Sequence, residues 1–204
     1  MIRQSLFLVA LAVVLCACAA TLPPANDPLS AEEHLRLGSI YEAKGSPALA
    51  LAEYGKAINI DDTNAGARFS AGNIELADRN FIEAAKHYRK AIELKPAEAA
   101  YHNNLGWVYM ETGDMTKARA QVKEALALDP AHGYVYLDTL GVIATRANAY
   151  KEAGQYFNEA AKSVPVDDTA GVDEINAHIQ ELFKLTNIPV KDAVIDERTD
   201  KGNR

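Results

Sequence analysis

Apolar and polar residues recur along this chain with the spacing of amphipathic helices. The helical segments are short, occur in pairs and are separated by polar breaks. Residues 35–41 carry leucine, isoleucine and tyrosine at helical spacing, after a capping box at residues 30–33. A Gly-Ser-Pro break at residues 45–47 ends this segment, and a second helical segment follows through residues 49–58. The pattern predicts helix, turn, helix and turn, repeated four times between residues 31 and 167.

The predicted helix pairs recur with a nearly constant period. Glycine returns at intervals of 34, 34 and 35 residues, two alanine positions keep the same intervals, and prolines close the last three copies. The members of these series are Gly38, Gly72, Gly106 and Gly141; Ala50, Ala84, Ala118 and Ala153; Ala57, Ala91, Ala125 and Ala160; and Pro96, Pro130 and Pro165. Such a period indicates stacked repeats, in which each unit buries its apolar face against the next. We place the copies at residues 31–64, 65–98, 99–132 and 134–167.

The repeat resembles the tetratricopeptide repeat (TPR), which has Leu-Gly at positions 7 and 8, alanine at 20 and 27, an aromatic residue at 24 and proline at 32. The aromatic position is filled by Tyr54, Tyr88 and Phe157, with Val122 in copy 3. Copy 2 departs most from the pattern, because Ala71 and Glu75 stand at positions 7 and 11. The resemblance implies an all-α superhelical solenoid of four helix-turn-helix repeats.

Beyond the repeats, one more helix is predicted. Five apolar residues form a helical stripe between residues 168 and 187, namely Val172, Ile175, Ile179, Leu182 and Phe183. We interpret this segment as a helix that caps the exposed end of the stack. Residues 188–204 form a polar tail.

The first 17 residues have the features of an export signal. Arg3 gives a positive start, and the apolar stretch at residues 6–15 is shorter than the roughly 20 residues that span a bilayer. Residues 15–18 (Leu-Cys-Ala-Cys) resemble the bacterial lipoprotein box, and we expect Cys18 to be lipidated because the small Ala17 precedes it. A plain secretory signal or an uncleaved anchor is the alternative.

The lipoprotein resemblance implies an acylated Cys18 and, with alanine next to it, sorting to the outer membrane, where the protein would face the periplasm. Residues 18–30 are rich in proline and are predicted to be a semi-rigid tether. The chain has 2 cysteines, at positions 16 and 18, so the repeats are expected to fold without a disulfide.

Charge and composition exclude several classes of function. The net charge of −7 argues against a nucleic-acid partner. No two of the 5 histidines are three or four residues apart, and no phosphate-binding loop or nucleophile elbow is present. His34 and His102 are interpreted as packing residues, and the Asp-Asp pairs at 61–62 and 167–168 as helix ends. We therefore predict no enzyme activity, no cofactor and no metal; a histidine beside a carboxylate in the groove would argue against this.

The TPR resemblance implies a ligand groove along the first helices of the repeats. Carried over by repeat position, the candidate groove residues are Phe69, Asn73, Leu76, Asn103, Asn104, Trp107, Met110, Asp138 and Arg146. Asn73 and Asn104 match the two asparagines of the family's carboxylate clamp, whereas the basic residues of that clamp are absent. Trp107 is interpreted either as an apolar contact for a ligand or as a packed aromatic residue.

These patterns predict a protein-protein interaction scaffold, anchored by lipid, that binds an extended segment of another envelope protein in its groove. TPR lipoproteins of this layout include pilotin-like proteins of type IV pilus biogenesis and adaptors for cell-wall enzymes, which are the alternatives. Assembly of the repeats into a homo-oligomer stays open.

Overall fold

The computed structural model describes residues 27–187, and all regular secondary structure within that range is helical. The helices are α2 (Ala31–Ala43), α3 (Pro47–Ile60), α4 (Ala65–Ala77), α5 (Phe81–Leu94), α6 (Ala99–Glu111), α7 (Met115–Leu128), the 3-10 turn η2 (Pro130–His132), α8 (Gly133–Arg146), α9 (Tyr150–Ser163) and α10 (Thr169–Thr186). The predicted all-α solenoid of four helix pairs and one capping helix is confirmed. Cys18, the signal segment and the polar tail lie outside the described residues.

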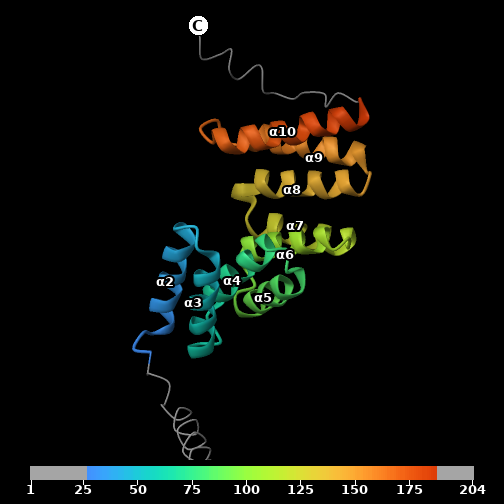
Figure 1. Cartoon of the computed structure of the whole chain (residues 1–204). Coiled ribbons are helices and arrows are strands. Elements are labelled where there is room, and N and C mark those ends of the chain that lie inside the picture. Colours follow the sequence, from blue (N-terminus) through green and yellow to red (C-terminus); the bar gives the residue numbers. More distant parts are fainter. Residues whose placement is uncertain (1–26, 188–204) are drawn as a thin grey trace, which may run out of the picture. The chain divides into compact units, whose positions relative to one another are not determined.

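The helices pack as successive pairs, each in contact with the next. The closest associations are within the pairs α2/α3, α4/α5, α6/α7 and α8/α9, and each second helix also contacts the first helix of the next pair (Figure 1). First helices also contact one another, α2 with α4, α4 with α6, and α6 with α8. The first helices therefore form one continuous row, which we call the inner row.

The repeated glycines allow the two helices of each pair to approach closely. A Cβ atom at Gly72 would lie 2.8 Å from Cε1 of Tyr88, and one at Gly106 would lie 2.5 Å from Cγ2 of Val122. The rings of Tyr54 and Phe157 occupy the same space in copies 1 and 4. Position 8 is therefore glycine because the side chain at position 24 fills the place of its missing methyl group.

The turn within each pair uses a left-handed residue at the fifteenth repeat position. The φ angles there are 70° at Gly45, 61° at Arg79, 86° at Gly113 and 58° at Asn148. This conformation suits glycine and, to a lesser degree, asparagine. The chain thus makes the same turn four times, and only in copy 2 with a residue poorly suited to it.

The two histidines predicted to be packing residues are indeed buried, and each has a hydrogen-bond partner 19 residues further on. Nδ1 of His34 lies 2.6 Å from Oε2 of Glu53, and Nδ1 of His102 lies 2.9 Å from Oε1 of Gln121. These contacts join repeat positions 4 and 23 across a helix pair. They stabilise the packing of the first helix on the second.

Helix α10 covers the last helix pair. Its N-cap residue is Asp168, which accepts hydrogen bonds from the backbone N–H of Gly171 (3.0 Å) and from the hydroxyl of Tyr134 (2.6 Å). The apolar residues that it buries against α9 and α8 are Ile175, Ile179 and Leu182. Phe183, predicted to share this stripe, is 48% exposed, because it lies at the edge of the contact. Between residues 27 and 187, no helix is long and apolar enough to cross a bilayer.

Candidate binding groove

The inner row carries the predicted groove residues, and in its N-terminal half these residues also hold the repeats together. The ring of Phe69 lies 4.7 Å from that of Tyr101 and 5.8 Å from that of Tyr88. Leu76 is partly buried against the core cluster that contains Tyr88. Both side chains join α4 to its neighbours and keep only part of their surface for a ligand.

Asn73 and Asn104 are brought together across the boundary between copies 2 and 3. Nδ2 of Asn104 donates to Oδ1 of Asn73 (2.8 Å), and the same oxygen accepts from the hydroxyl of Tyr88 (2.8 Å). Burial raises the pKa of Tyr88, so this hydroxyl stays protonated and remains a donor. The asparagine pair is therefore held in one arrangement before any ligand arrives.

Copy 1 has a similar contact with a carboxylate in place of the amide. The hydroxyl of Tyr54 donates to Oε2 of Glu42 over 2.7 Å. Burial, and then the hydrogen bond to Glu42, raise the pKa of Tyr54 to about 12. In copies 1 and 2, then, a core tyrosine reaches from the second helix to a polar side chain of the inner row.

Arg146 is engaged in an ionic contact. Nη1 of Arg146 lies 2.6 Å from Oε1 of Glu111, and Nη2 of Arg79 lies 3.7 Å from the other oxygen of the same carboxylate. Glu111 thereby links the C-terminal end of α8 to the turn that follows α4. A ligand that used Arg146 would have to compete with this carboxylate.

The C-terminal part of the inner row contains a hollow of about 120 Å³, between α6, α8 and α10. We call it the polar hollow. Its lining residues are Asn103, Trp107, Tyr134, Val135, Asp138, Thr139, Gly171, Glu174 and Ile175. Three predicted groove residues, Asn103, Trp107 and Asp138, meet here.

Met110 does not face a ligand surface. Its side chain is 1% exposed and packs in the core with Leu140 and Ile143. The expectation that Met110 contributes to the groove is therefore corrected, because the α6–α8 contact buries this position.

Sequence reasoning missed the contribution of α10 to the hollow. Glu174 and Ile175 line it, but the segment was interpreted only as a cap. Aligning α10 with the first helices of the repeats places Glu174 in register with Asn104 and Thr139, whereas Ile175 aligns with the core residues Leu105 and Leu140. The useful signal was therefore the repeat register beyond copy 4.

A histidine–carboxylate pair, which the sequence analysis did not foresee, lies beside the polar hollow. Nδ1 of His178 is 2.9 Å from Oδ1 of Asp138, and Asp138 is 7% exposed. The hydrogen bond to Asp138 raises the pKa of His178, which burial alone would lower. The hydroxyl of Thr139, the residue after Asp138, donates to the carbonyl of Val135. A histidine beside a carboxylate is the arrangement that would argue against the predicted lack of enzyme activity.

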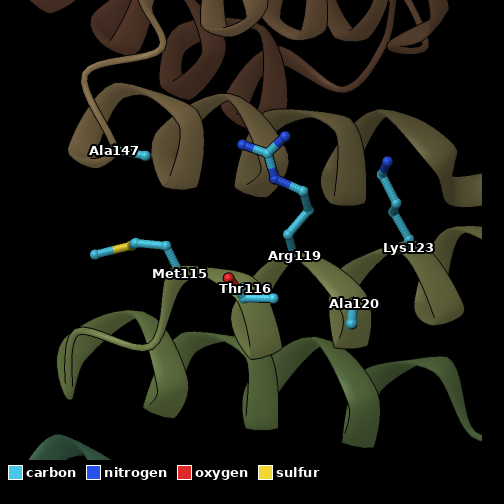
Figure 2. A pocket seen from close by; sticks show the side chains of 6 residues that line it. All are labelled: Met115, Thr116, Arg119, Ala120, Lys123 and Ala147. Carbon is cyan, nitrogen blue, oxygen red and sulfur yellow. The ribbon is translucent and has the colours of Figure 1, made fainter.

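A second hollow, of about 550 Å³, lies on α7 and is shown in Figure 2. Its lining residues are Met115, Thr116, Arg119, Ala120, Lys123 and Ala147. Five of its six lining residues belong to the second helix α7, and the sixth, Ala147, follows α8. Arg119 is also paired with Glu152 of α9, so this hollow is crossed by a contact between repeats.

Comparisons with known proteins agree with this architecture. Models of the tetratricopeptide repeat match residues 34–64 and 69–132. The type IV pilus assembly protein PilF of Pseudomonas aeruginosa is 26% identical over 134 residues, covering 65% of this chain and 53% of that protein. Anaphase-promoting complex subunit 3 of Schizosaccharomyces pombe is 26% identical over 137 residues, covering 67% of this chain and 20% of that protein. The chain thus spans about half or less of the length of these relatives.

Solved structures show the same fold. A crystal structure of MamA superimposes with a TM-score of 0.62 and 26% identity, covering 67% of this chain and 80% of MamA. The structure of Pseudomonas aeruginosa PilF gives a TM-score of 0.61 at 20% identity, with 84% and 83% coverage, and supports the fold alone. Residues 34–64 and 69–132 therefore match the tetratricopeptide repeat, and the described residues form an all-helical solenoid similar to those of TPR proteins.

Proposed function

We propose that the protein is a non-enzymatic scaffold that binds an extended segment of another envelope protein in the groove of its inner row. A lipid on Cys18 anchors it to the outer membrane, with the repeats facing the periplasm. The groove uses Phe69, Asn73, Leu76, Asn103, Asn104, Trp107, Asp138 and Arg146.

The polar hollow is the observation that carries this proposal. Trp107 and Val135 line it, and Val135 is 40% exposed although it is apolar. Asp138 and Asn103 lie beside them and offer polar atoms. An apolar contact surrounded by a few oriented polar groups is the usual composition of a protein recognition site.

Preorganisation supports the same conclusion. The side chains of Asn73 and Asn104 are fixed by hydrogen bonds, and Glu111 and Arg146 by an ion pair. Little side-chain entropy remains to be lost on binding, which favours affinity. A membrane anchor with a short tether then raises the effective concentration of the groove near other envelope proteins.

Site-specific crosslinking tests the groove. A photo-crosslinking amino acid at position 135 should capture one discrete envelope protein in living cells, and Trp107→Ala should reduce the yield. The control places the same amino acid at Ile82, which is 82% exposed on the second helix α5. Equal capture from both positions would refute the groove, and capture of a second copy of the chain would indicate self-assembly instead.

Membrane fractionation tests the anchor separately. Cys18→Ala should release the protein into the soluble periplasmic fraction, whereas Cys16→Ala should leave it in the outer membrane. Continued membrane association of the Cys18 variant would contradict lipidation at that residue.

A role in type IV pilus assembly is a more specific form of the proposal, supported by the similarity to PilF. In a strain that lacks the protein, surface pili should be lost, and the wild-type gene but not the Cys18→Ala gene should restore them. Normal pili with altered cell-wall cleavage would favour the alternative role as an adaptor for cell-wall enzymes.

A further inference from the structure

We propose that Asp138, Glu174 and His178 form a binding site for one Zn²⁺ ion at the C-terminal end of the inner row. This proposal goes beyond the scaffold function, with which it shares Asp138 and the polar hollow, because it concerns the affinity of the chain for an inorganic ion and is measured without a protein partner. Zinc in proteins is bound by imidazole nitrogen and carboxylate oxygen, which are the groups present here.

Two helices supply the three side chains. Glu174 and His178 are four residues apart on α10, so both lie on the same face of that helix, one turn apart. Asp138 comes from α8. One potential ligand atom of each residue lies within 4.8 Å of the other two. Within residues 27–187 this is the one group of three such side chains found at that spacing.

The distance between the ligand atoms of His178 and Asp138 is close to the distance between two ligands of one zinc ion. Nδ1 of His178 and Oδ1 of Asp138 are 2.9 Å apart. Ligands at about 2.0–2.2 Å from a tetrahedral zinc ion lie about 3.3 Å from each other. Zn²⁺ can therefore replace the proton between these atoms after a small movement, so that Nδ1 presents its lone pair to the ion. The imidazolium form releases this proton to water, and the neutral ring transfers it through solvent to Nε2. Glu174, which is exposed, can reach the ion by rotation of its side chain.

The polar hollow supplies the remaining coordination position. Asp138 and Glu174 form part of its wall, and its volume of about 120 Å³ accommodates water. A zinc site with three protein ligands commonly keeps its fourth position for water. The hollow thus completes the tetrahedron without a fourth side chain.

Asn103 is a second, independent sign of a polar ligand at this place. It lines the same hollow, it is 9% exposed, and its Oδ1 atom is buried without a hydrogen-bond partner in the structure. A buried acceptor of this kind is unfavourable unless a donor is supplied. Water bound to the ion is such a donor, and contacts of this type orient metal-bound groups.

The surroundings also hold the histidine ring in position. The ring of Phe157 stacks on His178 with 5.7 Å between centroids. By contrast, the His132–Asp129 pair lies within one turn near the surface, and no third metal-ligating side chain is found beside it among residues 27–187. His132 is therefore a suitable control, because it presents a histidine beside an aspartate without the hollow.

Isothermal titration calorimetry with ZnCl₂ tests the site in the untagged full chain, held in detergent and freed of metal beforehand with a chelator. We expect saturable binding of one ion per chain and a higher melting temperature in its presence. His178→Ala and Glu174→Gln should each weaken binding by about tenfold or more, whereas His132→Ala should leave it unchanged. MgCl₂ should give no saturable binding, since Mg²⁺ prefers oxygen ligands in an octahedron.

Several outcomes would overturn the proposal. These are the absence of saturable zinc binding to the wild-type chain, equal affinity after the changes at positions 174 and 178, and equal binding of Mg²⁺. Glu174→Gln is the decisive variant, because the side chain is exposed and its replacement leaves the helix packing intact. Circular dichroism of each variant verifies that the helices are retained.

Discussion

At the scale of single residues, the size of the side chain at repeat position 24 dictates glycine at position 8. Gly141→Ala should destabilise the protein by about 1–3 kcal/mol, because its methyl group would overlap the buried ring of Phe157. Urea denaturation followed by circular dichroism measures this. Gly55→Ala is the matched control, since no atom lies within 4 Å of a Cβ there and α3 should gain about 0.5–1 kcal/mol. A neutral effect at Gly141 would contradict the packing described.

Protonation of His87 should change the free energy of unfolding of the protein. Burial lowers the pKa of His87, and Arg68 lowers it further, in opposition to Glu75 and Glu83. A histidine with a lowered folded-state pKa takes up its proton more readily when unfolded. Its contribution to stability is therefore complete above the unfolded pKa of about 6.5 and is lost as the pH falls below that value.

His87→Gln should consequently show a smaller loss of stability than the wild type between about pH 7 and pH 5. Denaturation midpoints at a series of pH values provide the comparison, and the difference between the two proteins isolates this residue from the carboxylates that titrate lower. Parallel curves for the two proteins would show that His87 titrates normally.

Some residue-scale features were predictable and others were not. The burial of His34 and His102 follows from their repeat position, because in copies 1 and 3 that position faces the second helix. The contact between Asp138 and His178 joins residues 40 apart, in α8 of copy 4 and in the capping helix α10. It depends on how α10 sits on α8, which no local spacing in the sequence encodes.

At the scale of elements, the turn of copy 2 is the least favourable of the four. Arg79 has a φ of 61°, where glycine carries no steric penalty and other residues are strained by about 1–2 kcal/mol. Arg79→Gly and Arg79→Ala both remove the ion pair with Glu111, but the glycine variant should be the more stable by about 1 kcal/mol. Thermal and urea unfolding of the two variants measure this difference, and the opposite order would show that the turn changes its conformation.

Copy 2 also shows why elements are easier to predict than their details. Ala71 and Glu75 depart from the TPR pattern, yet α4 and α5 form as in the other copies. Ala71 is buried, and Oε2 of Glu75 accepts a hydrogen bond from Asn80 (2.8 Å) in the turn that follows. Packing against the neighbouring copies thus compensates for a weak local sequence, as expected for helices that gain most of their stability from tertiary contacts.

At the scale of the whole molecule, a stack in which each unit contacts only its neighbours should lose structure locally. Ile179→Ala, which removes a buried contact of α10, should cost about 2–5 kcal/mol of local stability. Leu185→Ala, on the same helix but at a side chain 57% exposed, should have an effect below about 0.5 kcal/mol.

Hydrogen exchange followed by mass spectrometry resolves where this stability is lost. In the Ile179 variant, amides of α9 and α10 should exchange faster, while those of α3 and α4 should be unaffected, because coupling along the stack passes only between neighbours. Uniformly faster exchange throughout the repeats would indicate a single cooperative unit instead.

The hydrogen bonds of Asn73 determine which kind of ligand atom can approach it. Its amide oxygen already accepts from Tyr88 and Asn104, which uses both lone pairs. The side chain can still donate hydrogen bonds through its N–H groups. A ligand group that binds to it must therefore offer an acceptor oxygen, such as that of a main-chain carbonyl. Asn73→Asp would retain both hydrogen bonds that the side chain accepts from Tyr88 and Asn104, so the fold should be unchanged. The aspartate has no N–H to donate, so a ligand carbonyl should no longer bind to it.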